Sequence, residues 1–273
     1  MLRLMIFAVA VCGLTPRVEA QTRATVDAGV ACGRENVSAG SNFSEDCDYS
    51  YAVALSPAWL PNWKFAFRAD ATSRTQPAWE DGVESNVYVS GPSITQKDKW
   101  LLGDVTYGVE FNAGSVSGEI FGGARMAHTS RSIKYGATDF SLPAQGEKYE
   151  FIGAGPIIGI STALSISRNW SIEGEANGAL LLGKRDNPTS SEAQNDSSLY
   201  QGSLGAALSL VWTQSDGGWS VAGGVKATHW LNFIDDKQSV DAKYFNYCSC
   251  SYLETVVDRT VFTPFLRVST SLP

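Results

Sequence analysis

The chain lacks long apolar runs, clusters of basic residues and apolar stripes with a helical period. Its N-terminal apolar run, 4–14, is too short for a membrane-spanning helix, which needs roughly 20 residues. With 21 Lys+Arg against 28 Asp+Glu, the net charge is −7, and this balance argues against nucleic-acid binding. Only 3 Met and 10 Pro are present, whereas Gly and aromatic residues are plentiful. We therefore predict no helix longer than a turn or two.

The first twenty residues have the features of an export signal. Arg3 supplies a positive charge, 4–14 is the apolar core, and 18–20 offers short residues at the positions that a signal peptidase reads. Cys12 raises the alternative of a lipoprotein, but Val11 stands before it, where a small residue is usual. A signal peptide over 1–20 is predicted, with cleavage after residue 20.

Four cysteines follow the predicted signal peptide, and an even number in an exported protein is compatible with disulfides. Cys32 and Cys47 are the natural local pair. Cys248 and Cys250 lie in a loop rich in Ser and Tyr, and neither His nor an acidic residue stands beside Cys248. We predict loop disulfides, no metal site and no cofactor.

From residue 61 onward, eight segments alternate apolar and polar residues as half-buried strands do. In the first, Trp63, Phe65 and Phe67 share one face, and Lys64 and Arg68 share the other. We predict a single antiparallel up-and-down transmembrane β-barrel of eight strands over 61–273, after an irregular periplasmic segment over 21–60. Ten strands are the alternative if 51–55 or 86–90 also pair. The alternating segments are 63–74, 101–111, 116–126, 152–166, 170–182, 201–212, 219–231 and 262–272.

The connections between these segments alternate in length. Short turns, such as 167–169, alternate with long loops, such as 76–99 and 131–148. Outer-membrane barrels have this asymmetry, which here puts both termini on the periplasmic side. Aromatic residues cluster at the short-turn ends as one interfacial belt, and others near the long-loop ends suggest a second. The first belt comprises Trp63, Phe111, Trp170, Trp212 and Trp219, and the second comprises Trp100, Tyr149, Tyr200 and Phe233.

Three residues break the pattern. Glu150 shares parity with the apolar face and is expected outside the hydrocarbon zone. Pro156 and Pro264 lie on the same face, and because proline cannot donate a ladder hydrogen bond, both are expected at bulges.

The stretch 148–185 carries a recognisable strand–turn–strand pattern. It has an aromatic-x-Gly-x-Gly-Pro strand, a tight turn before an aromatic residue, and a Gly/Ala strand that ends in Leu-Leu-x-Gly-Lys. The pattern residues are Phe151, Gly153, Gly155, Pro156, Trp170, Gly178, Leu181, Leu182, Gly183 and Lys184. This stretch, with Phe121–Arg125 before it, resembles the Legionella-type major outer membrane protein family of pore-forming β-barrels. The resemblance extends from about Trp100 to the C-terminus. It implies an outer-membrane location and pore activity, without catalytic residues.

The polar faces of the strands carry six positive and six negative side chains. Eight strands enclose a lumen about as wide as its own side chains, and buried charges there must be paired. The interior is therefore either a cross-linked plug or a narrow aqueous conduit with weak ion selectivity. The charges are Lys64, Arg68, Asp70, Arg74, Asp104, Glu110, Glu119, Arg125, Glu173, Glu175, Lys226 and Arg267.

Three functions follow from these patterns. The first is a porin-like or narrow channel for small solutes or ions, with lipid, lipopolysaccharide and the barrel assembly machinery as partners. The second is a non-conducting structural or adhesin barrel that acts through its long loops. The third is a lipid A-modifying hydrolase with His128 and Ser130, in which Asp139 or Glu147 orients His128 in a Ser-His-acid arrangement. The first is expected, and no catalytic residue is otherwise predicted. The sequence leaves the oligomeric state open.

Overall fold

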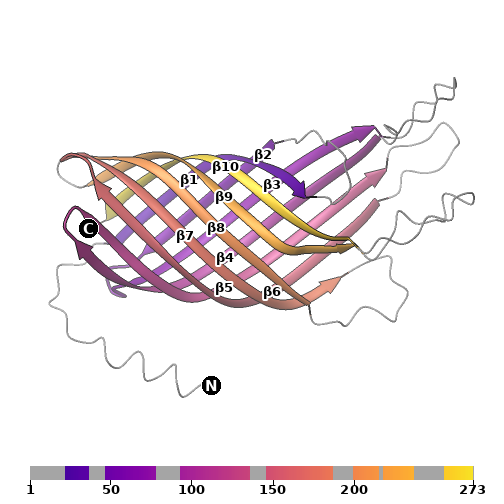
Figure 1. The fold of residues 1–273 in the computed structure, drawn as a ribbon, viewed down its shortest axis with the longest axis horizontal. Coiled ribbons are helices and arrows are strands. Elements are labelled where there is room, and N and C mark those ends of the chain that lie inside the picture. The colour runs from indigo at the N-terminus through magenta and orange to yellow at the C-terminus, as the bar shows by residue number, and fades with distance from the viewer. Residues whose placement is uncertain are drawn as a thin grey trace, which may run out of the picture.

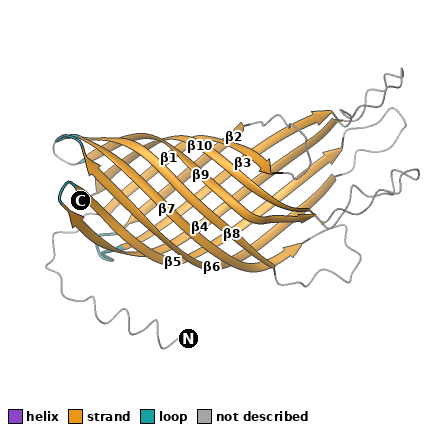
Figure 2. Ribbon diagram, in the orientation of Figure 1, coloured by secondary structure: helices purple, strands orange, loops and turns teal. Residues whose placement is uncertain are grey.

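The structure is a computed structural model that describes residues 22–36, 47–77, 93–135, 146–186, 199–214, 218–236 and 255–272. These residues form one closed barrel of antiparallel strands (Figures 1 and 2). No helix in the described residues is long and apolar enough to cross a membrane. The strands are β1 (Thr22–Asn36), β2 (Cys47–Ser56), β3 (Trp63–Pro77), β4 (Ser93–Ala113), β5 (Val116–Tyr135), β6 (Gly146–Ser165), β7 (Trp170–Asp186), β8 (Leu199–Thr213), β9 (Trp219–Asp236) and β10 (Thr255–Leu272).

Every strand pairs with its neighbours in sequence, and β1 closes the barrel by pairing with β10. Thr22 at the start of β1 lies opposite Leu272 at the end of β10, so both described ends of the chain meet at one end of the barrel. The short turns lie at this same end (Figure 1). We call it the short-turn end, and the opposite end the long-loop end.

The prediction of eight strands is wrong, and the ten-strand alternative is confirmed. The segment 21–60, predicted to be irregular, supplies β1 and β2. The pairing expected for 51–55 occurs within β2, whereas 86–90 lies outside the described residues, as does the predicted signal peptide over 1–20. The alternation of apolar and polar residues is weak in β1, because the small residues Ala28, Gly29 and Ala31 occupy both of its faces.

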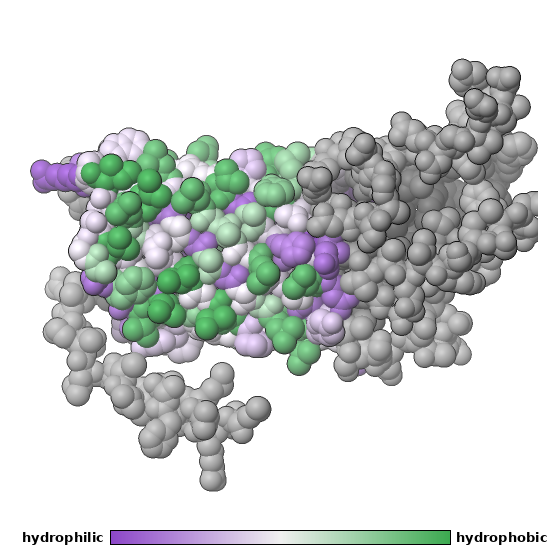
Figure 3. Space-filling model, viewed as in Figure 1, coloured by the Kyte–Doolittle hydropathy of each residue, from purple (hydrophilic) through white to green (hydrophobic). Residues whose placement is uncertain are grey.

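The alternation of the strands sorts the side chains between an apolar exterior and a polar interior. On β6, Ile152, Ile158 and Ile160 are exposed on the outer face, whereas Phe151 and Ile157 are buried inside. Apolar residues are spread over the outer face between the two ends (Figure 3). An exposed apolar surface of this extent needs an apolar surrounding rather than water.

The two strand prolines cause no shift of register, which corrects the expectation of bulges. Pro156 lies opposite Ala124 and Pro264 lies opposite Val225 in regular register. The ladder has a gap only on the other side of each strand. Residues 155–156 have no partner on β7, and residues 263–264 have none on β1. Beyond each gap the register is unchanged. A missing N–H group accounts for such a local gap. The one shift of register between β9 and β10 lies at Val257 and Arg259.

Candidate functional site: the barrel lumen

The interior of the barrel contains a cavity of about 500 Å³ that reaches the short-turn end. Ser56, Asn112 and Ser117, at the ends of β2, β4 and β5, line it there. Ten of the twelve charges predicted to face the lumen line this cavity. They are Lys64, Arg68, Asp104, Glu110, Glu119, Arg125, Glu173, Glu175, Lys226 and Arg267.

The other two predicted lumen charges lie on β3. Asp70 is buried and forms an ion pair of 2.6 Å with Arg68, and it accepts a hydrogen bond of 2.6 Å from the Ser50 hydroxyl. Arg68 Nη1 also donates to Thr228, so this group connects β2, β3 and β9. Arg74 belongs to β3, but its side chain lies outside the described part of the structure.

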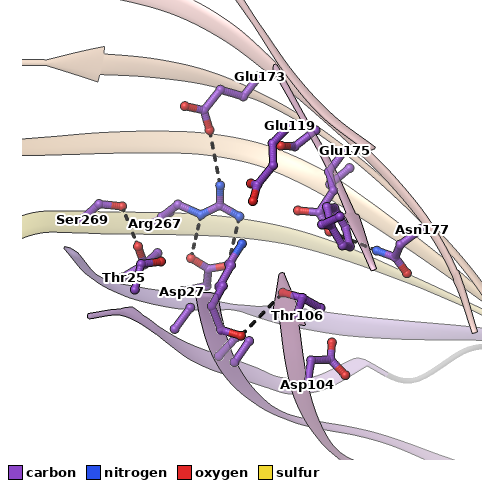
Figure 4. A pocket seen from close by; sticks show the side chains of 18 of the residues that line it. Thr25, Asp27, Asp104, Thr106, Glu119, Glu173, Glu175, Asn177, Arg267 and Ser269 are labelled. Carbon is purple, nitrogen blue, oxygen red and sulfur yellow. Dashed lines mark hydrogen bonds and ion pairs between the residues drawn. The ribbon is translucent and has the colours of Figure 1, made fainter. Parts of the chain in front are cut away.

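Two further arginines of the cavity are held by carboxylates in bidentate pairs. Arg125 donates to both oxygens of Asp104 at 2.8 Å, and to the hydroxyl of Ser203. Arg267 donates to both oxygens of Asp27, at 2.8 and 3.2 Å, and lies 3.5 Å from Glu173 (Figure 4). Two parallel bonds fix the orientation of each guanidinium group. Asp27 was missed in the sequence because it stands in the segment predicted to be irregular.

Six charged side chains of the cavity have no ion pair within 4 Å among the described residues: Arg23, Lys64, Lys226, Glu110, Glu119 and Glu175. Glu175 accepts a hydrogen bond from Asn177, and Glu119 lies near it in the cavity (Figure 4). Because an unpaired charge is costly to remove from water, these six groups require a hydrated cavity. The side chains therefore make this part of the lumen suitable for water and small ions.

Toward the long-loop end, a packed layer of side chains closes the lumen. We call it the closing layer; its core is Trp100, Phe151, Leu181, Trp230 and Val261, all nearly inaccessible to solvent. Trp100 and Trp230 stack with their ring centroids 6.5 Å apart. These residues come from β4, β6, β7, β9 and β10, so the layer crosses the whole lumen.

A buried ionic group lies beside the two tryptophans. Asp98 accepts hydrogen bonds from Arg131 at 2.8 and 3.0 Å, and Arg259 Nη1 lies 3.0 Å from its Oδ2 atom. The guanidinium group of Arg259 also lies 5.7 Å from the centre of the Trp100 ring, and it donates to Thr72. The Asp98 side chain is fully buried. This group ties β3, β4, β5 and β10 together across the closing layer.

The aromatic belt predicted at the short-turn end is found in part on the outer face. Trp170 and Trp219 are exposed, and Trp212 contacts Trp219 edge to face at 5.1 Å. Trp63 contacts Tyr107 in the same way at 5.6 Å, whereas Phe111 also borders the cavity.

The second predicted belt, at the long-loop end, is wrong in two members. Trp100 and Tyr149 point inward and are buried, so only Tyr200 of the described side chains faces outward. The side chain of Phe233 is not in the described set.

His128 and Ser130 lie on the outer face of β5, as predicted. The two expected partners, Asp139 and the side chain of Glu147, lie outside the described residues. Instead, Glu150 on β6 lies opposite Ser130, and its carboxylate is 3.4 Å from Nε2 of His128. Glu150 also contacts Lys148 at 2.5 Å. Glu150, which breaks the apolar pattern of its face, thus contacts two other polar side chains, His128 and Lys148, on the outer face.

Cys32 and Cys47 form a disulfide between β1 and β2. Cys248 and Cys250 are not among the described residues. Within the described part of the chain, no group of three His, Cys, Asp or Glu side chains is placed to hold a metal ion.

The chain is similar to solved structures of bacterial outer-membrane proteins at low identity. The outer membrane protease OmpT from Escherichia coli is 10% identical, with a TM-score of 0.48, over 95% of this chain and 99% of that one. A major outer membrane protein from Thermus thermophilus is 14% identical, with a TM-score of 0.33, over 92% of this chain and 99% of that one. No curated protein matches.

A family model identifies the chain more directly. The model described as the Legionella pneumophila major outer membrane protein precursor matches residues 62–244, which is more than half of the chain. The match spans β3 to β9 and includes the strand–turn–strand pattern of 148–185. This confirms the resemblance, and the chain is an outer-membrane β-barrel that belongs to the Legionella major outer membrane protein family.

Proposed function

We propose that the protein is a narrow outer-membrane channel for small ions and polar solutes, closed in this structure by the closing layer. The observation that carries the proposal is a cavity lined by six charged side chains without an ion pair, which ends at one layer of side chains. A purely structural barrel gains nothing from unpaired charges in its lumen, because each costs free energy to keep there. In this proposal the short-turn end faces the periplasm, and both termini lie on that side.

Planar-bilayer conductance of the refolded protein tests the channel. The wild-type protein is expected to give small, infrequent steps, and the variant W100A/W230A larger and more frequent ones, because two rings leave the closing layer. The control is W212A/W219A, which removes two tryptophans from the outer face. A heat-modifiability gel establishes that each barrel is folded.

A folded W100A/W230A barrel that conducts no better than lipid alone would overturn the channel. The alternative that this result supports is a non-conducting structural or adhesin barrel acting through its long loops, which lie outside the described residues.

A hydrolase that cleaves acyl esters of lipid A is a second candidate, favoured by the contact between His128 and Glu150. Ser130 stands two residues along β5 from His128, on the same face and opposite Glu150. In this candidate the Ser130 hydroxyl attacks the ester carbonyl while His128 takes its proton. The ester C–O bond breaks, the lipid A hydroxyl leaves with the proton from His128, and the acyl group stays on Ser130. Water, deprotonated by His128, then attacks the acyl-serine and releases the fatty acid, and the proton returns to Ser130. Mass spectrometry of lipid A from cells that express the wild type or S130A tests it. Identical lipid A in both strains would exclude the hydrolase.

A further inference from the structure

Lysine side chains gather on the outer face at the long-loop end, on three of the four adjacent strands β4 to β7. Lys97 and Lys99 belong to β4, Lys148 to β6 and Lys184 to β7, and all four are exposed. We call these four lysines the basic patch. Hydrophilic residues border the apolar outer face beside the long loops (Figure 3).

The register of the strands brings the four lysines close to one another on the outer face. Lys97 and Lys148 both lie opposite Ser132 of β5. Lys184 lies opposite Ile152, which is four residues along β6 from Lys148. Because neighbouring strands are about 4.8 Å apart, Lys97 and Lys148 stand roughly 10 Å from each other. A single ligand that carries more than one anionic group can therefore contact several of these ammonium groups at once.

Among the described side chains, the charge of the basic patch is mostly uncompensated. Glu150 contacts Lys148 and His128, but Lys97, Lys99 and Lys184 have no ion pair among the described residues. Elsewhere on the outer face at this end, from β8 through β10 and β1 to β2, the described side chains include the acid Asp258 and no Lys or Arg. The described cations thus occupy one side of the barrel, which lysines placed only to extend toward water would not require.

Large apolar side chains lie directly below the basic patch, toward the middle of the barrel. Leu101 follows Lys99 on the same face of β4, Ile152 follows Glu150 on β6, and Leu182 precedes Lys184 on β7. All three are exposed, Ile152 and Leu182 to about two thirds (64% and 65%). The surface therefore changes from cationic to aliphatic within two residues along each strand.

We propose that the basic patch binds the phosphate groups of a phosphorylated glycolipid of the outer leaflet, with the acyl chains of that lipid against the aliphatic surface below. A free anion would use only the lysines, whereas an anchored lipid matches both the cationic and the apolar part. The inference rests on the outer-membrane location and on long loops that face outward. It is independent of conduction through the lumen.

Native mass spectrometry of the refolded protein in detergent tests this proposal with diphosphoryl lipid A, dephosphorylated lipid A and inorganic phosphate as separate probes. We expect one tightly held diphosphoryl lipid A, and weaker binding of the dephosphorylated form. Loss of one lysine should weaken that binding about fivefold. K99Q and K184Q are therefore compared with R168Q, which removes one exposed positive charge from the opposite end of the barrel and should change nothing. The variant K97Q/K99Q/K148Q/K184Q should lose the retained lipid.

Three results would overturn the proposal. They are equal binding of phosphorylated and dephosphorylated lipid A, equal weakening by R168Q and K99Q, and displacement of lipid A by an equal concentration of inorganic phosphate. If the fourfold variant does not fold, the single variants still decide the outcome. Planar-bilayer conductance is measured on the same samples, so failure of the channel and failure of lipid binding are distinguished.

Discussion

At the scale of single residues, the closing layer depends on a buried carboxylate with two guanidinium partners. Asp98 contacts both Arg131 and Arg259, and all three side chains are almost fully buried. The cost of removing these three charges from water offsets much of the attraction between them. With all three partners present, their net contribution to the free energy of unfolding is therefore small. Removal of one member has a larger effect because it leaves buried charge without a partner.

We therefore expect Asp98→Asn to lower the free energy of unfolding by about 3 kcal/mol, since two guanidinium groups lose their counter-ion. Equilibrium unfolding in urea, in detergent or lipid, measures the change. Asp48→Asn is the control, because Asp48 bonds only to the backbone N–H of Tyr49 in the described structure and should cost less than about 0.5 kcal/mol. Equal effects of the two substitutions would show that the ionic group is not a special determinant of stability.

The sequence predicts the charges of the cavity better than those of the closing layer. Alternation identifies Lys64, Glu175 and Arg267 because they stand inside strongly alternating segments. Asp98 and Arg131 were assigned to loops, and Arg259 fell before the predicted last strand, because the apolar signal fades where strands extend beyond the membrane zone. The closing layer therefore emerges only when ladder pairing extends β4, β5 and β10 through these residues.

At the scale of elements, close approach of neighbouring strands explains one of the glycines in the resemblance pattern. A Cβ added at Gly155 of β6 would lie within 1.9 Å of the carbonyl oxygen of Leu180 on β7. A Cβ added at Gly103 of β4 would instead meet only the end of the Met126 side chain, at 4.0 Å. Backbone atoms cannot move aside as the end of a flexible side chain does. A Cβ should therefore be tolerated at Gly103 but not at Gly155.

Gly155→Ala is expected to cost about 2 kcal/mol or more of folding free energy, because β6 and β7 must separate locally. Gly103→Ala should stay within about 0.5 kcal/mol. Urea unfolding followed by tryptophan fluorescence compares the two variants. Similar midpoints would mean that the strands adjust to a Cβ at Gly155.

The strands that the sequence reveals are those with large apolar residues on one face. The predicted ranges for β6 and β7 agree with the structure to within a few residues, since Ile, Leu and Trp alternate strongly there. In β2, Tyr49, Tyr51 and Val53 also alternate, but the strand is only 10 residues long. The direction of Trp100 was mistaken because aromatic residues near a strand end suit both an interface and a packed interior.

At the scale of the whole molecule, the cavity carries balanced charge. Its lining includes six cations and six anions: Arg23, Lys64, Arg68, Arg125, Lys226 and Arg267 against Asp27, Asp104, Glu110, Glu119, Glu173 and Glu175. A lumen without net charge discriminates little between cations and anions. Three of these arginines, Arg68, Arg125 and Arg267, are in ion pairs, so the two lysines, which have no ion pair among the described residues, are well placed to meet a passing ion.

We expect the opened variant W100A/W230A to show a reversal potential near zero in a KCl gradient. Adding K64E to this variant changes the lumen charge by −2 and should raise the ratio of cation to anion permeability severalfold. K148E, which makes the same change on the outer face, is the matched control. An unchanged reversal potential after K64E would show that the measured current does not pass this cavity.

Closure of the barrel by β1 and β10 has a consequence for its assembly. The ladder between these strands joins the first and last described segments of the chain, from Thr22 opposite Leu272 to Asn36 opposite Asp258. A nascent or truncated polypeptide that ends before Thr255 leaves the backbone groups of β1 and β9 unpaired on one side. Hydrocarbon offers them no hydrogen-bonding partner, and exposed edges invite association with other chains. Because β10 is needed to close the barrel, incomplete translation products cannot insert stably in the membrane.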